Sequence, residues 1–74
     1  MYGKEVTLKV IINGFEMEIP EGTTIMRLLD IINEPLKPDM IVEVNRRFIH
    51  SKLYESTMLR AGDSAEVIHL DIGG

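Results

Sequence analysis

Residues 6–19 read VTLKVIINGFEMEI, and this stretch decides the fold. Apolar and polar residues alternate on both sides of Asn13-Gly14, which predicts two half-buried strands. Asn-Gly favours a two-residue turn with positive φ at both central positions. A turn of this length fixes the register, so that every inner pair is apolar and Lys9 faces Glu18 on the outer side. We therefore predict a hairpin with the pairs Ile12–Phe15, Ile11–Glu16, Val10–Met17, Lys9–Glu18 and Leu8–Ile19.

A short amphipathic helix is predicted next. Pro20-Glu21-Gly22 ends the second strand, and Thr23 or Thr24 can cap a helix by accepting a hydrogen bond from a backbone N–H group. Apolar residues then recur at i, i+3, i+4 and i+7, until Asn33 and Pro35 end the helix. A helix of about 9–10 residues is unstable alone in water, so it should pack on the inner face of the sheet. Its apolar stripe consists of Ile25, Leu28, Leu29 and Ile32.

The remaining segments complete a mixed sheet. Met40–Val44 is predicted as a third strand, Phe48-Ile49 as a short strand and Ala65–Leu70 as the last strand. The polar stretch Tyr54–Thr57 is assigned no chemistry. The last strand should run parallel to the first in the middle of the sheet, with a right-handed crossover. The pattern predicts an α+β fold of the ubiquitin-like β-grasp type, with a mixed four- to five-stranded sheet and one helix on one face.

Composition and charge narrow the classes of function. Of the 74 residues, 45% are hydrophobic and 27% charged, as in ordinary globular domains. A chain this short buries about 60% of its unfolded surface and has little core to spare for a deep catalytic pocket, so we expect no enzyme. The net charge of −4 disfavours nucleic-acid binding and favours a protein partner with a basic face. The absence of cysteine excludes disulfides and thiolate sites.

No segment of the sequence indicates export or membrane insertion. Met1–Glu5 has no apolar signal core after Lys4. No apolar run approaches the roughly 20 residues that span a bilayer. His50 and His69 lie far apart without other residues at metal-ligand spacing, so no metal site is expected. We expect a cytoplasmic monomer that binds no cofactor of its own.

The C-terminal end carries the sharpest functional signal. Gly73-Gly74 follows Asp71-Ile72 directly after the last strand. Without Cβ atoms, such an end can adopt many backbone conformations and enter a channel too narrow for side chains. It also carries an unhindered α-carboxylate, although an incidental Gly-Gly is the alternative. We predict a domain over residues 1–70 and a flexible tail over residues 71–74, with Ile72, Gly73 and Gly74 as its functional residues.

The uncovered face of the sheet is a candidate docking surface. Ile11 in the first strand and Ile68 and Leu70 in the last should point outward, away from the helix. If these strands are neighbours, the three residues form an apolar patch that leads to the tail. Isolated exposed aliphatic residues are common on any protein surface. The docking prediction therefore depends on the three residues lying together.

Several short motifs follow one another along the chain: Ile12-Asn13-Gly14, Gly22-Thr23-Thr24-Ile25 with Leu28-Leu29, Ile41 to Asn45, Leu59 to Asp63, Glu66-Val67-Ile68 and Gly73-Gly74. In this order and spacing, they resemble the ThiS/MoaD family of small sulfur carriers. The likeness covers nearly the whole chain, and the Val42-Glu43-Val44-Asn45 stretch is closer to the thiamine-pathway carrier. One departure is Asn45-Arg46, where the family usually has Asn-Gly. Because Arg adopts positive φ less readily than Gly, this departure favours a longer turn or one of another type. Another is Asp71 in a tail that is usually apolar there.

The resemblance implies a carrier rather than an enzyme. It implies that an E1-like adenylyltransferase activates the carboxylate of Gly74 with ATP and Mg²⁺. A sulfur donor of the cysteine desulfurase or rhodanese type would then supply sulfur for a C-terminal thiocarboxylate. A thiazole synthase, or another acceptor enzyme, would receive that sulfur in thiamine biosynthesis. A molybdopterin-type carrier, a ubiquitin-like protein modifier and a plain β-grasp interaction domain remain open as alternatives.

Overall fold

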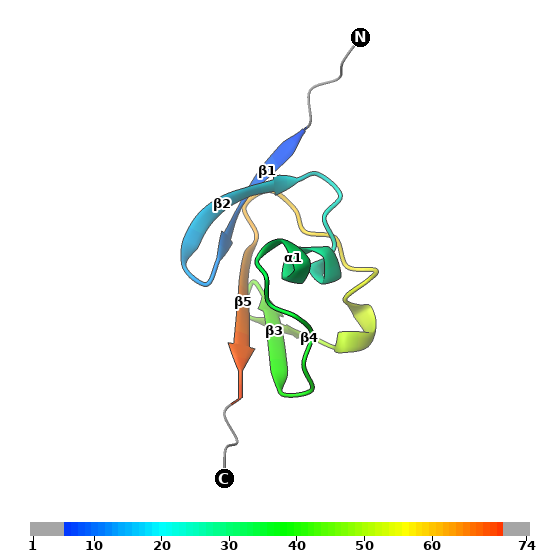
Figure 1. Cartoon of the computed structure of the whole chain (residues 1–74). Helices are drawn as coiled ribbons and strands as arrows, with labels where there is room; N and C mark the ends of the chain where they lie inside the picture. The colour runs from blue at the N-terminus through cyan, green and yellow to red at the C-terminus, as the bar shows by residue number, and fades with distance from the viewer. Residues whose placement is uncertain (1–5, 71–74) are drawn as a thin grey trace.

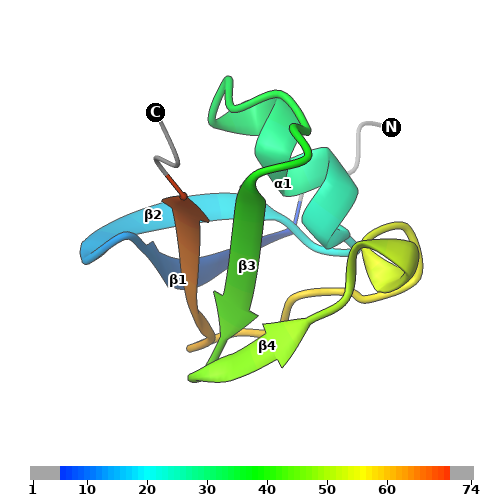
Figure 2. The same cartoon turned by 90° about the horizontal axis from the view of Figure 1, so that it is seen from below.

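The computed structural model describes residues 6–70, so the predictions for Ile72, Gly73 and Gly74 lie outside the described residues. Five strands form one mixed sheet in the order β2-β1-β5-β3-β4. One helix packs on one face of this sheet (Figures 1 and 2), which confirms the predicted α+β β-grasp architecture. The elements are β1 (Thr7–Ile12), β2 (Phe15–Pro20), α1 (Ile25–Ile31), β3 (Met40–Val44), β4 (Arg47–Ile49), the 3₁₀ turn η1 (Ser51–Leu53) and β5 (Ser64–His69).

The β1–β2 hairpin has the predicted register at every pair from Leu8–Ile19 to Ile12–Phe15. Asn13 and Gly14 have φ values of 50° and 86°, the positive values that a two-residue turn of this kind requires. Turn chemistry and alternation specify the same register here. This local agreement explains why the hairpin could be predicted from the sequence alone.

The last strand, β5, lies between β1 and β3 as predicted. It runs parallel to β1 and antiparallel to β3, and it begins one residue earlier than expected, at Ser64. The parallel β1–β5 pairing is short because the chain leaves β1 at Asn13. The side chain of Asn13 extends the ladder, since the Val67 N–H donates to Asn13 Oδ1 (2.8 Å) while the Asn13 N–H donates to the Ala65 carbonyl (2.9 Å).

Helix α1 is shorter than the predicted 9–10 residues. Thr24 is its N-cap, with Oγ1 accepting a hydrogen bond from the Arg27 N–H (3.1 Å). Ile32 already leaves the helical conformation, and Asn33 reverses the chain with a φ of 62°. The apolar stripe is nevertheless correct, because Ile25, Leu28 and Leu29 are buried on the sheet and Ile32 is half-buried against the core.

The core contains one residue that the sequence analysis had placed in a polar stretch. Tyr54 directly follows η1 and is only 1% exposed. Burial raises the pKa of its hydroxyl above the ordinary value of 10.0, while a backbone hydrogen bond with Val42 opposes this shift. Tyr54 therefore completes the core beside the helix. The other core residues are Val10, Ile12, Ile19, Ile25, Leu28, Leu29, Met40, Val42, Leu59, Ala65 and Val67.

The β3–β4 turn corrects one expectation. It has two residues, as its flanking pair Val44–Arg47 shows, and it is not longer than the usual Asn-Gly turn. Asn45 and Arg46 both adopt positive φ, at 53° and 69°. The Asn45 amide stabilises this conformation, because it donates to Asp63 Oδ1 (2.9 Å) and accepts from the Ser64 N–H (3.0 Å). Arg46 therefore adopts a left-handed conformation that residues other than Gly, Asn and Asp seldom adopt.

Candidate functional site

The outer face of the sheet is the candidate site that the described residues offer. Successive residues of a strand point to opposite faces, and α1 covers only the inner face (Figure 2). In β5, Ala65 and Val67 are buried under the helix, whereas Glu66 and Ile68 are exposed. The same alternation in β3 buries Met40 and leaves the next residue facing outward. No helix within residues 6–70 covers this outer face.

The three residues predicted for docking are exposed but not adjacent to one another. Ile11 is 39%, Ile68 36% and Leu70 40% exposed. Ile11 lies opposite Ser64, four positions before Ile68, which corresponds to about 13 Å along the strand. The register thus places Ile11 on the same face as Ile68 but well away from it. Their role in docking stays a prediction.

Two other apolar residues lie on the same face as Ile68, and the sequence analysis did not include them. Ile41 is the direct cross-strand partner of Ile68. Phe48, in the neighbouring strand β4, is 61% exposed, and its ring makes an edge contact with His50 at a centroid distance of 6.3 Å. Alternation within Met40–Val44 already indicated that Ile41 points outward, but its pairing with β5 could not be read from local sequence. We call Ile41, Phe48, Ile68 and Leu70 the outer patch.

Hydrogen bonds fix the end of β5, next to the outer patch. The Leu70 N–H donates to the Asp39 carbonyl (2.8 Å). On the inner face, His69 Nε2 lies 2.8 Å from Glu34 Oε1, in the loop that follows α1. Both contacts tie the last described residues to the segment between α1 and β3. The outer patch therefore lies next to the end of β5, which these two contacts hold in place.

The two histidines have structural contacts rather than metal-site geometry. His50 Nδ1 accepts a hydrogen bond from the Lys52 N–H (3.1 Å) and so caps η1. His69 contacts Glu34, as described above. Over residues 6–70, no group of three or more potential ligands could hold a metal ion. In the same range, no helix is long and apolar enough to cross a membrane.

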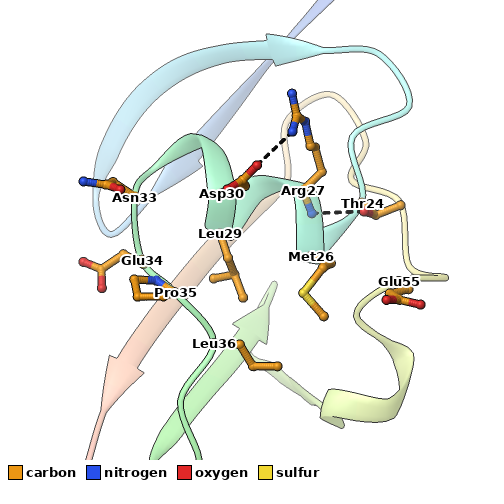
Figure 3. A pocket seen from close by; sticks show the side chains of 10 residues that line it. All are labelled: Thr24, Met26, Arg27, Leu29, Asp30, Asn33, Glu34, Pro35, Leu36 and Glu55. Atoms are coloured by element: carbon orange, nitrogen blue, oxygen red, sulfur yellow. Dashed lines mark hydrogen bonds and ion pairs between the residues drawn. The ribbon is translucent and has the colours of Figure 1, made fainter.

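A shallow hollow on the helix side is the other depression of note (Figure 3). Met26, Leu29 and Leu36 supply its apolar part. Three of its charged groups already have partners, since Arg27 Nη1 lies 2.8 Å from Asp30 Oδ2 and Glu34 contacts His69. The Thr24 hydroxyl that lines it is used to cap α1. The lining residues therefore bring together no nucleophile and base, and the hollow is not a candidate active site.

The comparisons with known proteins agree with the fold. The sequence profile of the ThiS family matches residues 10–74. The crystal structure of the thiamine biosynthesis protein ThiS from Geobacter metallireducens is similar, with a TM-score of 0.79. The match covers 90% of this chain and 100% of that chain at 20% identity, so it supports the fold alone. No curated protein matches the sequence. Because the family profile covers most of the hairpin and all of the helix, the outer patch and the terminal glycines, the chain belongs to the ThiS family.

Proposed function

We propose that the protein is a sulfur carrier of thiamine biosynthesis, with the C-terminal carboxylate of Gly74 as the group that carries sulfur. The observation that carries this proposal is the extent of the family match, which continues through Gly73 and Gly74 to residue 74. The similar structure is itself named as a thiamine biosynthesis protein. The fold supports the proposal, because the Gly-Gly end follows the central strand of a compact domain.

The proposed chemistry needs a partner enzyme. A carboxylate oxygen of Gly74 attacks the α-phosphorus of ATP, pyrophosphate leaves, and an acyl-adenylate forms. The terminal sulfur of an enzyme persulfide then attacks the acyl carbon, and AMP leaves. A thiol cleaves the resulting acyl disulfide, which releases the thiocarboxylate and leaves a disulfide on the donor side. ATP and Mg²⁺ are bound by the E1-like adenylyltransferase, and a cysteine desulfurase or rhodanese-type protein supplies the persulfide.

The domain acts as a rigid handle for this chemistry. Backbone hydrogen bonds hold β5 between β1 and β3, and the contacts of His69 and Leu70 anchor its end. An anchored end lowers the entropy lost when a partner orients the segment beyond it. The outer patch, with Ile68 and Leu70 next to that end, is the proposed docking surface for the activating enzyme. The thiazole synthase that accepts the sulfur is expected to dock on the same surface, with Ile11 at its margin.

Intact-mass measurement tests the proposal directly. The purified chain is incubated with an E1-like adenylyltransferase, ATP, Mg²⁺, cysteine and a cysteine desulfurase. We expect the mass to increase by the difference between sulfur and oxygen, and fragmentation should locate the change at Gly74. The matched control is a chain that lacks Gly74, which should keep the same thermal unfolding curve but gain no mass.

Two outcomes would contradict the proposal. An unchanged wild-type mass with active partner enzymes would exclude the carrier function. A mass shift that persists without Gly74 would place the chemistry elsewhere. Adducts with other proteins that survive a denaturing gel would instead favour the ubiquitin-like modifier.

A further inference from the structure

The outer face carries two carboxylates at its centre, within the apolar surroundings of the outer patch. Glu43 in β3 lies directly opposite Glu66 in β5, where Cβ atoms are about 5 Å apart. Like charges in directly opposed positions destabilise a sheet. Glu43 is half-buried and Glu66 is exposed. A pair that weakens the free domain is a departure from local consistency, and such departures are concentrated at functional sites.

No cation within the described residues neutralises this pair. The ion pairs of residues 6–70 are Arg27–Asp30 and His69–Glu34, and both lie on the helix side of the sheet. Arg46 lines the same hollow as Glu43 and Glu66, yet it forms no ion pair with either carboxylate. The free domain therefore presents two carboxylates without an ion-pair partner beside the apolar residues of the outer patch.

The neighbours of the pair suit a long basic side chain. Phe48 lies opposite Glu43 on the other side of β3, so an aromatic ring borders the carboxylates. The Ile41–Ile68 pair lies on the same face, two positions along both strands. An arginine side chain fits these neighbours. Its guanidinium group can donate to two carboxylates and stack on an aromatic ring, while its methylene groups pack against aliphatic side chains.

We propose that Glu43 and Glu66 together receive an arginine or lysine side chain of the activating enzyme, and that this contact selects the partner. This inference rests on the proposed carrier function. Charge complementarity supports it, since the chain has 12 acidic and 8 basic side chains and neither Glu43 nor Glu66 forms an ion pair within residues 6–70. Continuity supports it as well, because Ile68 and the anchored end of β5 belong to the same face.

The contact would favour the correct partner in two ways. A basic side chain relieves the repulsion between Glu43 and Glu66 as it binds, so the unfavourable term of the free domain disappears in the complex. A protein with an acidic or purely apolar counter-surface would leave both carboxylates desolvated and unpaired, which is strongly unfavourable. The apolar residues of the outer patch then exclude water around the ion pair.

Neutral isosteres at the two positions test the inference. The variants are Glu43→Gln, Glu66→Gln and the double substitution, and the probe is an E1-like adenylyltransferase from the same organism. The matched control is Glu55→Gln, which removes the same charge from the helix side of the molecule (Figure 3). Binding is measured by calorimetry at low and at moderate salt. Adenylation is followed by pyrophosphate release, and the stability of each free chain by denaturant unfolding.

We expect each single substitution at Glu43 or Glu66 to weaken binding at least about tenfold, because a desolvated charge pair loses one partner. The double variant should also show a smaller salt dependence of Kd than the wild type. KM for adenylation should rise with little change in kcat, since neither residue touches the reacting carboxylate. The denaturation midpoint of the free variants should stay level or rise, whereas a purely structural role would lower it.

The outcomes separate this inference from the carrier function. If all three variants bind within twofold of Glu55→Gln while the wild type still gains its thiocarboxylate, the proposed contact is wrong and the carrier function stands. A lower denaturation midpoint that accounts for the loss of binding would likewise overturn the contact. If the wild type is never adenylated or sulfurated, both the contact and the carrier function are wrong.

Discussion

The two faces of the sheet are built from the same strands and contain the same kinds of aliphatic residue, yet their surroundings differ completely. Val67 is 8% exposed, whereas its neighbour Ile68 is 36% exposed. Val10 and Ile11 show the same contrast, at 1% and 39%. Hydrophobicity does not distinguish the two sets, since the side chains are nearly equivalent. The position of α1 distinguishes them, because it covers only one face.

This contrast divides stability from recognition within one small sheet. Residues of the inner face lose their contact with water when the chain folds, and this burial is the main favourable contribution to stability. Residues of the outer patch keep much of their contact with water until a partner binds. Substitutions on the inner face should therefore change unfolding, and those on the outer face should change binding. The following variants test this division, beginning with the largest expected change in stability.

The helix stripe on the inner face should be the most sensitive region. Leu28→Ala or Leu29→Ala should lower the free energy of unfolding by about 2–5 kcal/mol, because each leaves a cavity beneath a fully buried position. The free energy of unfolding of a small domain is only about 5 kcal/mol in total, so either variant should be close to global unfolding. Denaturant unfolding followed by circular dichroism measures this. Unchanged midpoints for both variants would contradict the assigned packing.

Asn13 should be the most sensitive polar residue. Asn13→Ala removes the acceptor of the Val67 N–H and places alanine, which tolerates positive φ less well than asparagine, at a φ of 50°. The lost acceptor alone should lower the free energy of unfolding by about 1–3 kcal/mol. Asn13→Gly isolates that contribution, because glycine tolerates the backbone conformation but offers no acceptor. Equal stability of Asn13→Gly and the wild type would show that the hydrogen bond contributes nothing.

Tyr54 should make stability fall at alkaline pH. Its pKa in the folded domain is raised above the ordinary value of 10.0, so near neutral pH both states carry the protonated hydroxyl. As the pH rises through the pKa of the unfolded state, the unfolded chain loses its proton first, and the free energy of unfolding decreases. Tyr54→Phe should flatten this decline. Denaturant midpoints of both proteins across the alkaline range test it, and parallel curves would contradict it.

The smallest change in stability should come from the outer patch. Ile68→Glu should leave the unfolding midpoint nearly unchanged, since the side chain is already exposed, but it should weaken binding to the activating enzyme. The matched variant is Val67→Glu, one residue away on the inner face, which should unfold the domain because it buries a charge. Unfolding of Ile68→Glu would show that Ile68 belongs to the core, and intact binding would remove it from the docking surface.

Local signals predicted most of the fold, and residues joined by long-range pairing produced the errors. The β1–β2 register followed from Asn13-Gly14, and the buried stripe followed from helical periodicity. The relation between Ile11 and Ile68 depended on the β1–β5 register, which no turn fixes, because the pairing residues Ile11 and Ser64 are far apart in sequence. The same limitation concealed the Ile41–Ile68 pair and the opposition of Glu43 to Glu66.

Two further errors concerned single residues, Tyr54 and Arg46. Tyr54 lies in a polar stretch, and its burial depends on its packing in the core cluster rather than on any local pattern. Arg46 disfavours positive φ by itself, but the two hydrogen bonds of the Asn45 amide hold the turn in that conformation. In both cases tertiary contacts outweighed the intrinsic preference. The role of the terminal glycines stays a prediction, because Gly73 and Gly74 lie outside the described residues.

The central position of β5 has a consequence for folding during translation on the ribosome. Until β5 emerges, β1 and β3 have no partner between them, and the sheet consists of two separate hairpins. Such pairs are marginal in water on their own, so the nascent chain should gain its stability late, in one cooperative step. Every molecule that has folded must therefore have been translated at least through His69. Chains terminated before the last strand would therefore stay unfolded and accessible to proteases. Proteolysis would remove them, so that the folded molecules all contain β5.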